Sequence, residues 1–206
     1  MEELKEYLRN RLNKSLPGAK AQMALEPAMS YGRHRGPAPG YARRASVMLL
    51  LHADDGEITV PMVKRRDDLA FHPGEMAFPG GGLERDESWT QAAVRECFEE
   101  TGIRPEQIEV LGMLTPLYVF GSVNLVMPVL GVGKRPPSYK IDEAEIDRVI
   151  DVPLEVVGTG RVGTTVRHLA GVFRKVPCFH VENAEIWGAS AMMLAELSAL
   201  MSDFSR

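Results

Sequence analysis

Cysteine and long apolar runs are both scarce in this sequence. The 206 residues include two cysteines, Cys97 and Cys178, which form neither a disulfide pattern nor a metal-ligand pattern. No apolar run approaches the roughly 18 residues that a membrane-spanning helix needs. The first sixteen residues, MEELKEYLRNRLNKSL, are charged and amphipathic, unlike a signal peptide. These absences predict a protein without a membrane partner that works in a reducing, cytoplasmic compartment.

A surplus of positive charge is also missing. The chain has 24 lysines and arginines against 28 aspartates and glutamates, a formal net charge of −4. Proteins that bind nucleic acid carry a basic patch or stripe, so we expect no nucleic-acid partner. The remaining composition, 45% hydrophobic and 25% charged residues, is ordinary for a globular protein with a substantial core.

The first 44 residues are predicted to form a helix and a loop. Leucine recurs at every fourth position of residues 2–16, at Leu4, Leu8, Leu12 and Leu16. This repeat predicts a helix that Pro17-Gly18 ends. Its apolar stripe would dock on the rest of the chain or on a partner subunit, which leaves a homodimer open. The mixed charges on its other faces disfavour a membrane-surface helix.

Residues 26–44 are rich in proline, glycine and arginine and show no periodicity, so they predict a loop. Their arginines are candidate phosphate contacts, with solvated loop charges as the alternative: Arg33, Arg35, Arg43 and Arg44. We therefore divide the chain into residues 1–44, a helix and a loop, and residues 45–206, a globular domain.

The globular domain begins with a predicted hairpin. Residues 46–52 (SVMLLLH) form the continuous apolar run of a buried strand, Asp54-Asp55-Gly56 is a turn, and residues 57–65 form a second strand. Within it, Pro61 implies an edge or a bulge. Residues 67–82 read as irregular. Further strands are predicted at 109–115, 123–132, 164–169 and 172–181, followed by a helix at 187–201 whose apolar face carries Ala191, Leu194, Leu197 and Met201. Strands interspersed with few helices predict an α/β sandwich, a mixed sheet between helical layers.

The most informative stretch is residues 81–103, GGLERDESWTQAAVRECFEETGI. Ser88 and Gln91 have the spacing of a capping box at a helix start, and Gly102 suits a helix stop. At about 100° per residue, Glu96, Glu99 and Glu100 share one arc of this helix. A second arc carries Val94, Cys97 and Phe98 and would face the core.

Carboxylates so placed destabilise the helix. Each pair at i, i+3 or i+4 costs about 0.2–0.5 kcal/mol, and the helix dipole disfavours anions in the last turn by about 0.3–1 kcal/mol each. One interpretation is a solvated acidic helix end. The other is a bound divalent cation, because hard cations such as Mg²⁺ prefer carboxylate oxygens and share substrate phosphates.

The spacing Gly81-x5-Glu87-x7-Arg95-Glu96-Cys97-x-Glu99-Glu100-x-Gly102-Ile103 resembles the Nudix box of the Nudix hydrolases. Cys97 stands where that family usually has a bulkier aliphatic residue. The resemblance implies a Nudix-type α/β/α sandwich. It also implies hydrolysis of a nucleoside diphosphate linked to a further group X, a small-molecule substrate, with Mg²⁺ or Mn²⁺ as the cofactor.

The resemblance also assigns roles within the box. It implies Glu96 and Glu100 as metal ligands, Glu99 as a further ligand or general base, and Gly81 as a carbonyl ligand. Arg95 would hold a glutamate in position, so Glu99, Arg95 and Glu100 are the expected catalytic residues. Glu87 would be a structural partner of Arg95 or a helix-start contact.

Residues 61–82, PMVKRRDDLAFHPGEMAFPGGG, resemble the coenzyme A pyrophosphatase branch of that family. The matching residues are Arg65, Leu69, His72, Gly74, Phe78, Pro79, Gly80 and Gly81. Four residues depart from the branch pattern: Val63, Arg66, Ala70 and Glu75. The candidate substrate-binding residues are Arg65, His72, Gly80 and Arg66.

Each of these residues also has a purely structural interpretation. Gly74 and Gly80 would permit tight turns, Phe78 would pack in the core, and His72 would be a structural histidine. For the function, coenzyme A or a derivative is the expected substrate. ADP-ribose, NADH or a nucleoside triphosphate is the alternative. A non-catalytic nucleotide-binding domain is disfavoured, because no box glutamate is missing.

Overall fold

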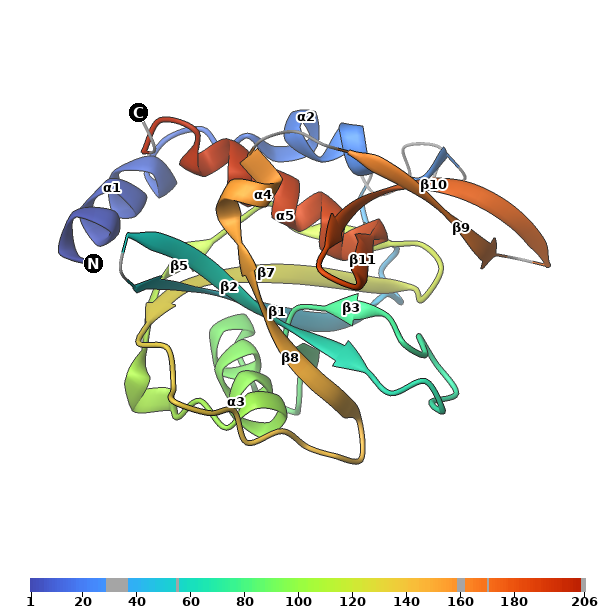
Figure 1. Cartoon of the computed structure of the whole chain (residues 1–206), viewed down its shortest axis with the longest axis horizontal. Helices are drawn as coiled ribbons and strands as arrows, with labels where there is room; N and C mark the ends of the chain where they lie inside the picture. Colours follow the sequence, from blue (N-terminus) through green and yellow to red (C-terminus); the bar gives the residue numbers. More distant parts are fainter. Residues whose placement is uncertain (29–36, 55, 159–161, 170, 205–206) are drawn as a thin grey trace.

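The computed structural model describes residues 1–28, 37–54, 56–158, 162–169 and 171–204. It shows a large mixed sheet with helices on both faces and a second, three-stranded sheet beside it (Figure 1). The strands of the large sheet are β1 Arg43–Asp54, β2 Glu57–Arg65, β3 Met76–Ala77, β4 Gly80–Gly82, β5 Ile108–Met113, β6 Leu117–Val119, β7 Asn124–Gly133 and β8 Ile146–Pro153. The predicted α/β sandwich is confirmed.

The large sheet runs in the order β3-β2-β1-β7-β5, with β4 beside β1, β6 beside β7 and β8 beside β2. β1 and β7 are parallel, and the other ladders are antiparallel. The hairpin predicted for residues 46–65 is present, with Asp54 opposite Glu57. Asp55 of its predicted turn lies outside the described residues.

The two strands of this hairpin diverge, and the segment predicted as irregular fills the gap between them. The ladder between β1 and β2 ends where His52 pairs with Thr59. Beyond this point β3 pairs with β2 and β4 pairs with β1. Pro61 lies in the gap, opposite Asp151 of β8, which is where a residue without an N–H is tolerated. β2 is therefore not an edge strand, and residues 67–82 are not wholly irregular.

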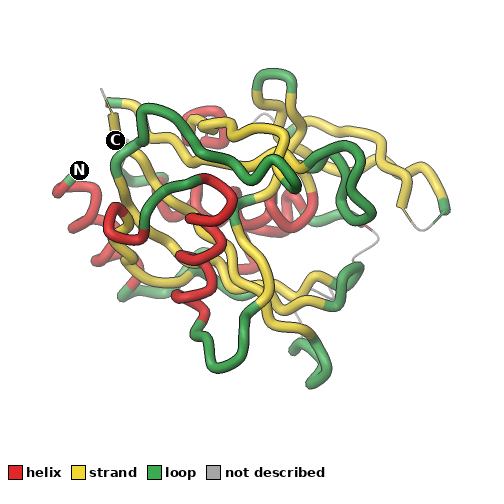
Figure 2. Tube along the Cα trace, turned by 90° about the horizontal axis from the view of Figure 1, so that it is seen from below, coloured by secondary structure: helices red, strands yellow, loops and turns green. Residues whose placement is uncertain are grey.

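Alternation along β1 builds a core on each face of the sheet. Met48 and Leu50 pack with Cys97 of α3 Trp89–Thr101, whereas Leu49 and Leu51 join the larger core on the opposite face. Successive side chains of a strand point to opposite faces, so one apolar run serves both layers. Figure 2 views the molecule from below, where α3 lies in front of the strands.

Five of the described helices cover the opposite face: α1 Glu2–Leu12, α2 Gly18–Gln22, the 3₁₀ helix Met23–Leu25, α4 Leu154–Gly158 and α5 Gly188–Met201, whereas the 3₁₀ helix Pro105–Gln107 lies beside α3. The predicted apolar residues of the last helix are all buried, together with Met192 and Met193. A buried carboxylate ties α5 to α2 and to Thr115. Glu196 of α5 accepts hydrogen bonds from the Gly18 N–H at 3.1 Å, from Gln22 at 2.8 Å and from the Thr115 hydroxyl at 2.7 Å.

Helix α1 is shorter than predicted and docks on its own chain. Leu4 and Leu8 are buried in the large core. The helix ends at Leu12, with Asn13 as its C-cap, rather than at residue 16. Leu16 itself is disfavoured in the helical region because it precedes Pro17. Pro17-Gly18 begins α2 instead of ending α1. The homodimer and the boundary at residue 45 stay predictions.

The second sheet contains β9 Gly163–Leu169, β10 Val172–Val181 and β11 Ala184–Trp187, in the order β11-β10-β9. Its first two strands confirm the prediction to within a residue. β11 lies against β3, so this sheet borders the segment that precedes the box. None of the described helices is long and apolar enough to span a membrane.

Candidate active site

Helix α3 carries most of the predicted site, and its ends are built as predicted. The Gln91 N–H donates to the Ser88 hydroxyl at 3.3 Å, and the Ser88 N–H donates to the Gln91 side chain at 2.9 Å. Gly102 closes the helix with φ of 74°, a conformation that favours glycine. Phe98, however, is 46% exposed, so its predicted place in the core is wrong.

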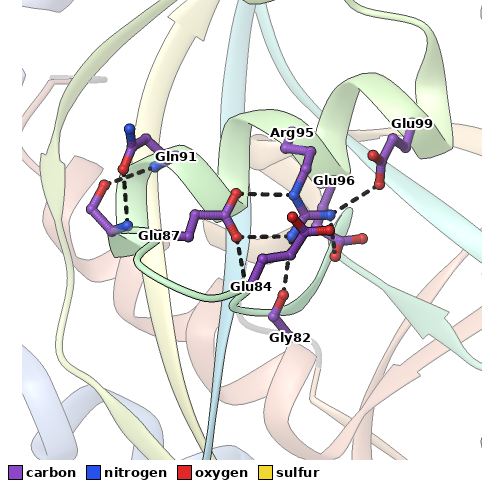
Figure 3. A network of polar contacts seen from close by, with 8 residues as sticks. Gly82, Glu84, Glu87, Gln91, Arg95, Glu96 and Glu99 are labelled. Atoms are coloured by element: carbon purple, nitrogen blue, oxygen red, sulfur yellow. Dashed lines mark hydrogen bonds and ion pairs between the residues drawn. The ribbon is translucent and has the colours of Figure 1, made fainter.

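Arg95 is the hub of the box (Figure 3). Its Nε and Nη2 atoms donate to the two oxygens of Glu87 at 2.9 and 3.0 Å. Nη1 donates to Glu96 at 2.8 Å and to Glu99 at 3.0 Å, and Nη2 also donates to the Gly82 carbonyl at 3.0 Å. All five N–H groups of the guanidinium are therefore engaged.

Glu87 is thus the structural partner of Arg95 that the sequence predicts. The guanidinium holds the pKa of the Glu87 carboxyl below its usual range. Glu87 also accepts the Glu84 N–H at 2.9 Å, which fixes the turn before α3. Because Glu87 is occupied in this way, Arg95 is oriented with its other N–H groups toward Glu96 and Glu99.

The glycine strand β4 lies directly against the glutamates of α3. A Cβ on Gly81 would lie 2.5 Å from Cδ and 2.7 Å from Oε2 of Glu96, and one on Gly80 would lie 2.7 Å from the Val47 Cα. Side chains are excluded at both positions because the strand is clamped between β1 and α3. The Gly80 N–H donates to Glu100 at 3.1 Å.

The ladder with β1 decides which glycine carbonyl faces α3. The Met48 N–H donates to the Pro79 carbonyl, and the Leu83 N–H donates to the Arg44 carbonyl. In an antiparallel ladder, hydrogen-bonded pairs alternate, so the pair between them, Ser46 with Gly81, is also hydrogen-bonded. The backbone polar groups of Gly81 therefore face β1. Those of Gly80 and Gly82 face α3, in agreement with their bonds to Glu100 and Arg95.

Two of the box glutamates are withdrawn from water. Burial raises the pKa of the Glu100 carboxyl to about 8. The hydrogen bond from the Gly80 N–H opposes this rise, and the nearby negative charge of Glu96 adds to it. Burial also raises the pKa of Glu96, although Arg95 opposes it. Glu99 is half exposed, with 53% of its side chain accessible. The helix therefore holds two partly desolvated carboxylates and one that faces water.

This donor set suits a hard divalent cation. Carboxylate oxygens are the ligands that Mg²⁺ and Mn²⁺ prefer, and a cation would relieve the cost of burying Glu96 beside Glu100. Among the described residues no three Asp, Glu, His or Cys side chains converge in a ready-made metal geometry. The reason is visible in Figure 3, where the guanidinium of Arg95 lies between Glu96 and Glu99.

Arg65 and an unpredicted glutamate complete this group of charges. The Arg65 guanidinium contacts one oxygen of Glu145 at 3.4 and 3.5 Å, and its buried Nε has no partner within the described chain. Its charge lowers the pKa of Glu100, whereas Glu145 raises the pKa values of Glu96 and Glu100. The only sequence signal for Glu145 is the acidic run of residues 139–148, which has no fixed spacing to the box.

Two other predicted substrate contacts, Arg66 and His72, are each paired with an acidic side chain. Arg66 binds both oxygens of Asp68, at 2.8 and 2.7 Å. His72 contacts Glu75 at 2.9 Å, and this hydrogen bond raises the pKa of His72. The basic departure at Arg66 and the acidic departure at Glu75 are therefore balanced locally.

The remaining departures and alternatives are also placed. Val63 is buried and Ala70 is exposed. Phe78 is buried, as its core interpretation requires. Arg43 donates to the Ser122 carbonyl, and Arg44 lies over the Trp89 ring. The other two candidate arginines, Arg33 and Arg35, lie outside the described residues.

Known proteins resemble this chain in sequence and in fold. The NUDIX domain model matches residues 42–157, more than half of the chain. The Uncharacterized Nudix hydrolase NudL of Yersinia pestis (strain Pestoides F) is 33% identical over 163 residues, which cover 78% of this chain and 80% of NudL. The C. elegans Ap4A hydrolase binary complex has a TM-score of 0.53 at 18% identity, over 79% of this chain and 99% of that one. RenU, a Nudix hydrolase from M. smegmatis, has a TM-score of 0.56 at 17% identity, over 79% and 87%.

The two similar structures show the fold alone, whereas the family model and the NudL relative show the family. The chain belongs to the Nudix hydrolase family. It is therefore a hydrolase of phosphoric anhydride bonds, as the box predicts.

Proposed function

We propose that the chain cleaves the diphosphate of coenzyme A or a derivative, giving phosphopantetheine and 3′,5′-ADP. The observation that carries the proposal is the buried carboxylate of Glu100 beside the partly buried carboxylate of Glu96, both packed against β4 near Arg65. Two desolvated carboxylates next to the Arg65 guanidinium, whose Nε has no partner among the described residues, favour a cation and a phosphate in the same place.

Glu96 and Glu100 are the proposed ligands of Mg²⁺, or of Mn²⁺, with Glu99 as a third. The ladder favours the carbonyl of Gly80 over that of Gly81 as a backbone ligand, because Gly80 faces α3. When bound, the cation would neutralise charge on the diphosphate and lower the pKa of a water molecule.

The protein side chains would divide the remaining work. Arg95 holds Glu96 through one oxygen, so the other oxygen of this carboxylate is available to a ligand. Glu99 is the half-exposed carboxylate and therefore the proposed base for the attacking water. Arg65 would bind the diphosphate, since a guanidinium matches phosphate geometry.

Coenzyme A is favoured by the course of residues 65–82, where the resemblance to the coenzyme A branch lies. This segment starts at Arg65, whose charge acts on Glu100, and ends in β4, where Gly80 binds Glu100. The departures at Arg66 and Glu75 are paired with Asp68 and His72, and the hydrogen bond to Glu75 raises the pKa of His72 toward its charged form. They therefore add little net charge against a polyanionic substrate.

A substrate panel tests this assignment. We expect purified protein with Mg²⁺ to show its highest kcat/KM with coenzyme A, and mass spectrometry to identify phosphopantetheine and 3′,5′-ADP. ADP-ribose, NADH and a nucleoside triphosphate are the competing substrates. A preference for ADP-ribose would refute the coenzyme A assignment but would still agree with the reaction class.

A variant tests the site itself. Glu100→Gln keeps the size of the side chain and removes its charge, so we expect turnover to fall about a hundred-fold or more. Mg²⁺ should also raise the Tm of the wild type and not that of the variant, because a ligand stabilises only the state that binds it. Exposed Glu106→Gln is the matched control. Full activity of Glu100→Gln would refute the metal site and favour a different catalytic group.

A further inference from the structure

A groove of about 360 Å³ lies between residues 64–76, from the end of β2 to β3, and the second sheet. One wall consists of Lys64, Gly74 and Met76, within the residues that the family model matches. The other wall lies beyond residue 157 and consists of Arg167, His180, Glu182, Asn183, Ala184 and Glu185. The volume is at the lower end of the range of small-molecule sites, about 300–1,000 Å³. The groove is thus formed where the family domain meets a sheet outside that match.

The wall on the second sheet is held rigidly. Arg167 Nη2 and the Thr165 hydroxyl both donate to one oxygen of Glu185, at 2.7 Å each. The Arg167 guanidinium lies over the Trp187 ring, 5.6 Å from its centroid. Its Nε is buried and has no partner within the described part of the chain. A guanidinium held at Glu185 and over Trp187 is therefore present in this wall.

The charges of the groove are balanced. Lys64 and Arg167 are matched by Glu182 and Glu185, and Asn183 adds an amide that both donates and accepts. Lys64 is further offset by carboxylates at 3.5 and 3.7 Å, from Asp147 and Asp67. A second phosphate would meet as much negative as positive charge here. An uncharged amide group would find both donors and acceptors.

The groove is within reach of the candidate active site. Met76 lines it, and four residues further along the chain the Gly80 N–H binds Glu100. Four residues span at most about 14 Å even when fully extended. A diphosphate held at Glu100 and Arg65 would therefore place a linear substituent of moderate length in the groove.

We propose that this groove binds the group X of the substrate, and that it takes an uncharged, amide-bearing arm. The proposal rests on the proposed function, because the arm must be joined to a diphosphate held at Glu96, Glu100 and Arg65. The second sheet is then the part of the chain that selects the substrate, whereas the box performs the reaction.

Pantetheine, the diamide arm without phosphate, is the probe. The chain has two tryptophans, Trp89 at the start of α3 and Trp187 under Arg167. In 5-fluorotryptophan-labelled full-length protein, millimolar pantetheine should shift the ¹⁹F signal of Trp187 and leave that of Trp89 in place. Arg167→Met should weaken this binding about ten-fold or more, because a hydrogen bond to a charged group is lost. Lys175→Met, on the opposite face of the same hairpin, is the matched control and should bind as the wild type does.

The kinetic counterpart separates the groove from the reaction. Arg167→Met should raise KM for coenzyme A about ten-fold and change KM for ADP-ribose less than about two-fold. If Arg167→Met does not fold, the same changes in KM are expected of Lys64→Met, on the other wall of the groove. Equal losses with both substrates, equal losses in Lys175→Met, or an unmoved Trp187 signal would overturn the subsite and leave the proposed function intact. If the wild type hydrolyses neither substrate, the proposed function fails, and the pantetheine titration still decides the groove.

Discussion

Gly81→Ala tests whether the packing of β4 against α3 sets the position of Glu96. The added Cβ would lie 2.5 Å from Cδ and 2.7 Å from Oε2 of Glu96, where ordinary contacts begin at 3.4 Å. The carboxylate must therefore move by about 1 Å, since the backbone of β4 is held by the ladder with β1. Gly82→Ala is the matched control, because a Cβ at Gly82 would meet nothing within 4 Å.

The expected loss of activity follows from that displacement. Misplacing a reacting group by about 1 Å costs about a hundred-fold in rate, or about 2.7 kcal/mol of transition-state stabilisation. Overpacking destabilises the fold by about 1–3 kcal/mol, and the lost freedom of the unfolded chain offsets about 0.4–1 kcal/mol of it. The Gly81→Ala protein should therefore fold and be a poor enzyme.

The assay compares kcat/KM and urea unfolding for the wild type, Gly81→Ala and Gly82→Ala. We expect Gly82→Ala to lie within about three-fold of the wild-type kcat/KM, because the Gly82 carbonyl that Arg95 uses is kept. Equal activity of the two variants would refute the reasoning, since the space beside Glu96 would then have no influence on the reaction.

Two further predictions concern stability. His52 is fully buried, its ring nitrogens have no partner within the described chain, and burial lowers its pKa despite nearby Asp151. Because a lowered folded-state pKa makes protonation favour the unfolded chain, wild-type stability should fall as the pH drops below about 6.5. When the free energy of unfolding in urea is measured against pH, the part of the slope that His52 contributes should vanish in His52→Leu. An unchanged slope would contradict the assignment. Leu8→Ala should lower the free energy of unfolding by about 2–5 kcal/mol, because Leu8 is fully buried. Asn10→Ala, at an exposed position of the same helix, should lower it little. Equal urea midpoints for the two variants would mean that α1 is not docked in solution.

The ends of α3 could be predicted from sequence because their causes are local. A capping serine with a glutamine three residues later, and a glycine at the C-cap, act within a few residues of chain. The core face of the same helix could not be predicted from sequence, because it includes a charged residue. The helical pattern places Glu100 on a different arc from the predicted core residues, yet Glu100 is 6% exposed and shares the buried face with Ala93 and Cys97. This rotates the core away from Phe98, which becomes exposed.

Two parts of the site depend on contacts between distant segments. Glu145 directly precedes β8, and the pairing of β8 with β2 brings it to Arg65, next to the box. The groove needs the second sheet to lie against β3. Neither pairing leaves a spacing in the sequence, since the residues that meet are separated by long and unrelated stretches of chain. The box, in contrast, is read from one continuous segment.

The charges at the site bear on how a polyanionic substrate could enter it. Four carboxylates gather there, from Glu96, Glu99, Glu100 and Glu145, and Arg95 has no free N–H left to offer a phosphate. Arg65 retains capacity, because its bonds to Glu145 are long, at 3.4 and 3.5 Å, and its Nε is unpartnered within the described chain. One guanidinium does not balance a diphosphate beside four carboxylates. The electrostatics therefore favour a substrate that arrives with divalent cations over the bare anion, and under the proposed function Arg65 would exchange Glu145 for a phosphate oxygen.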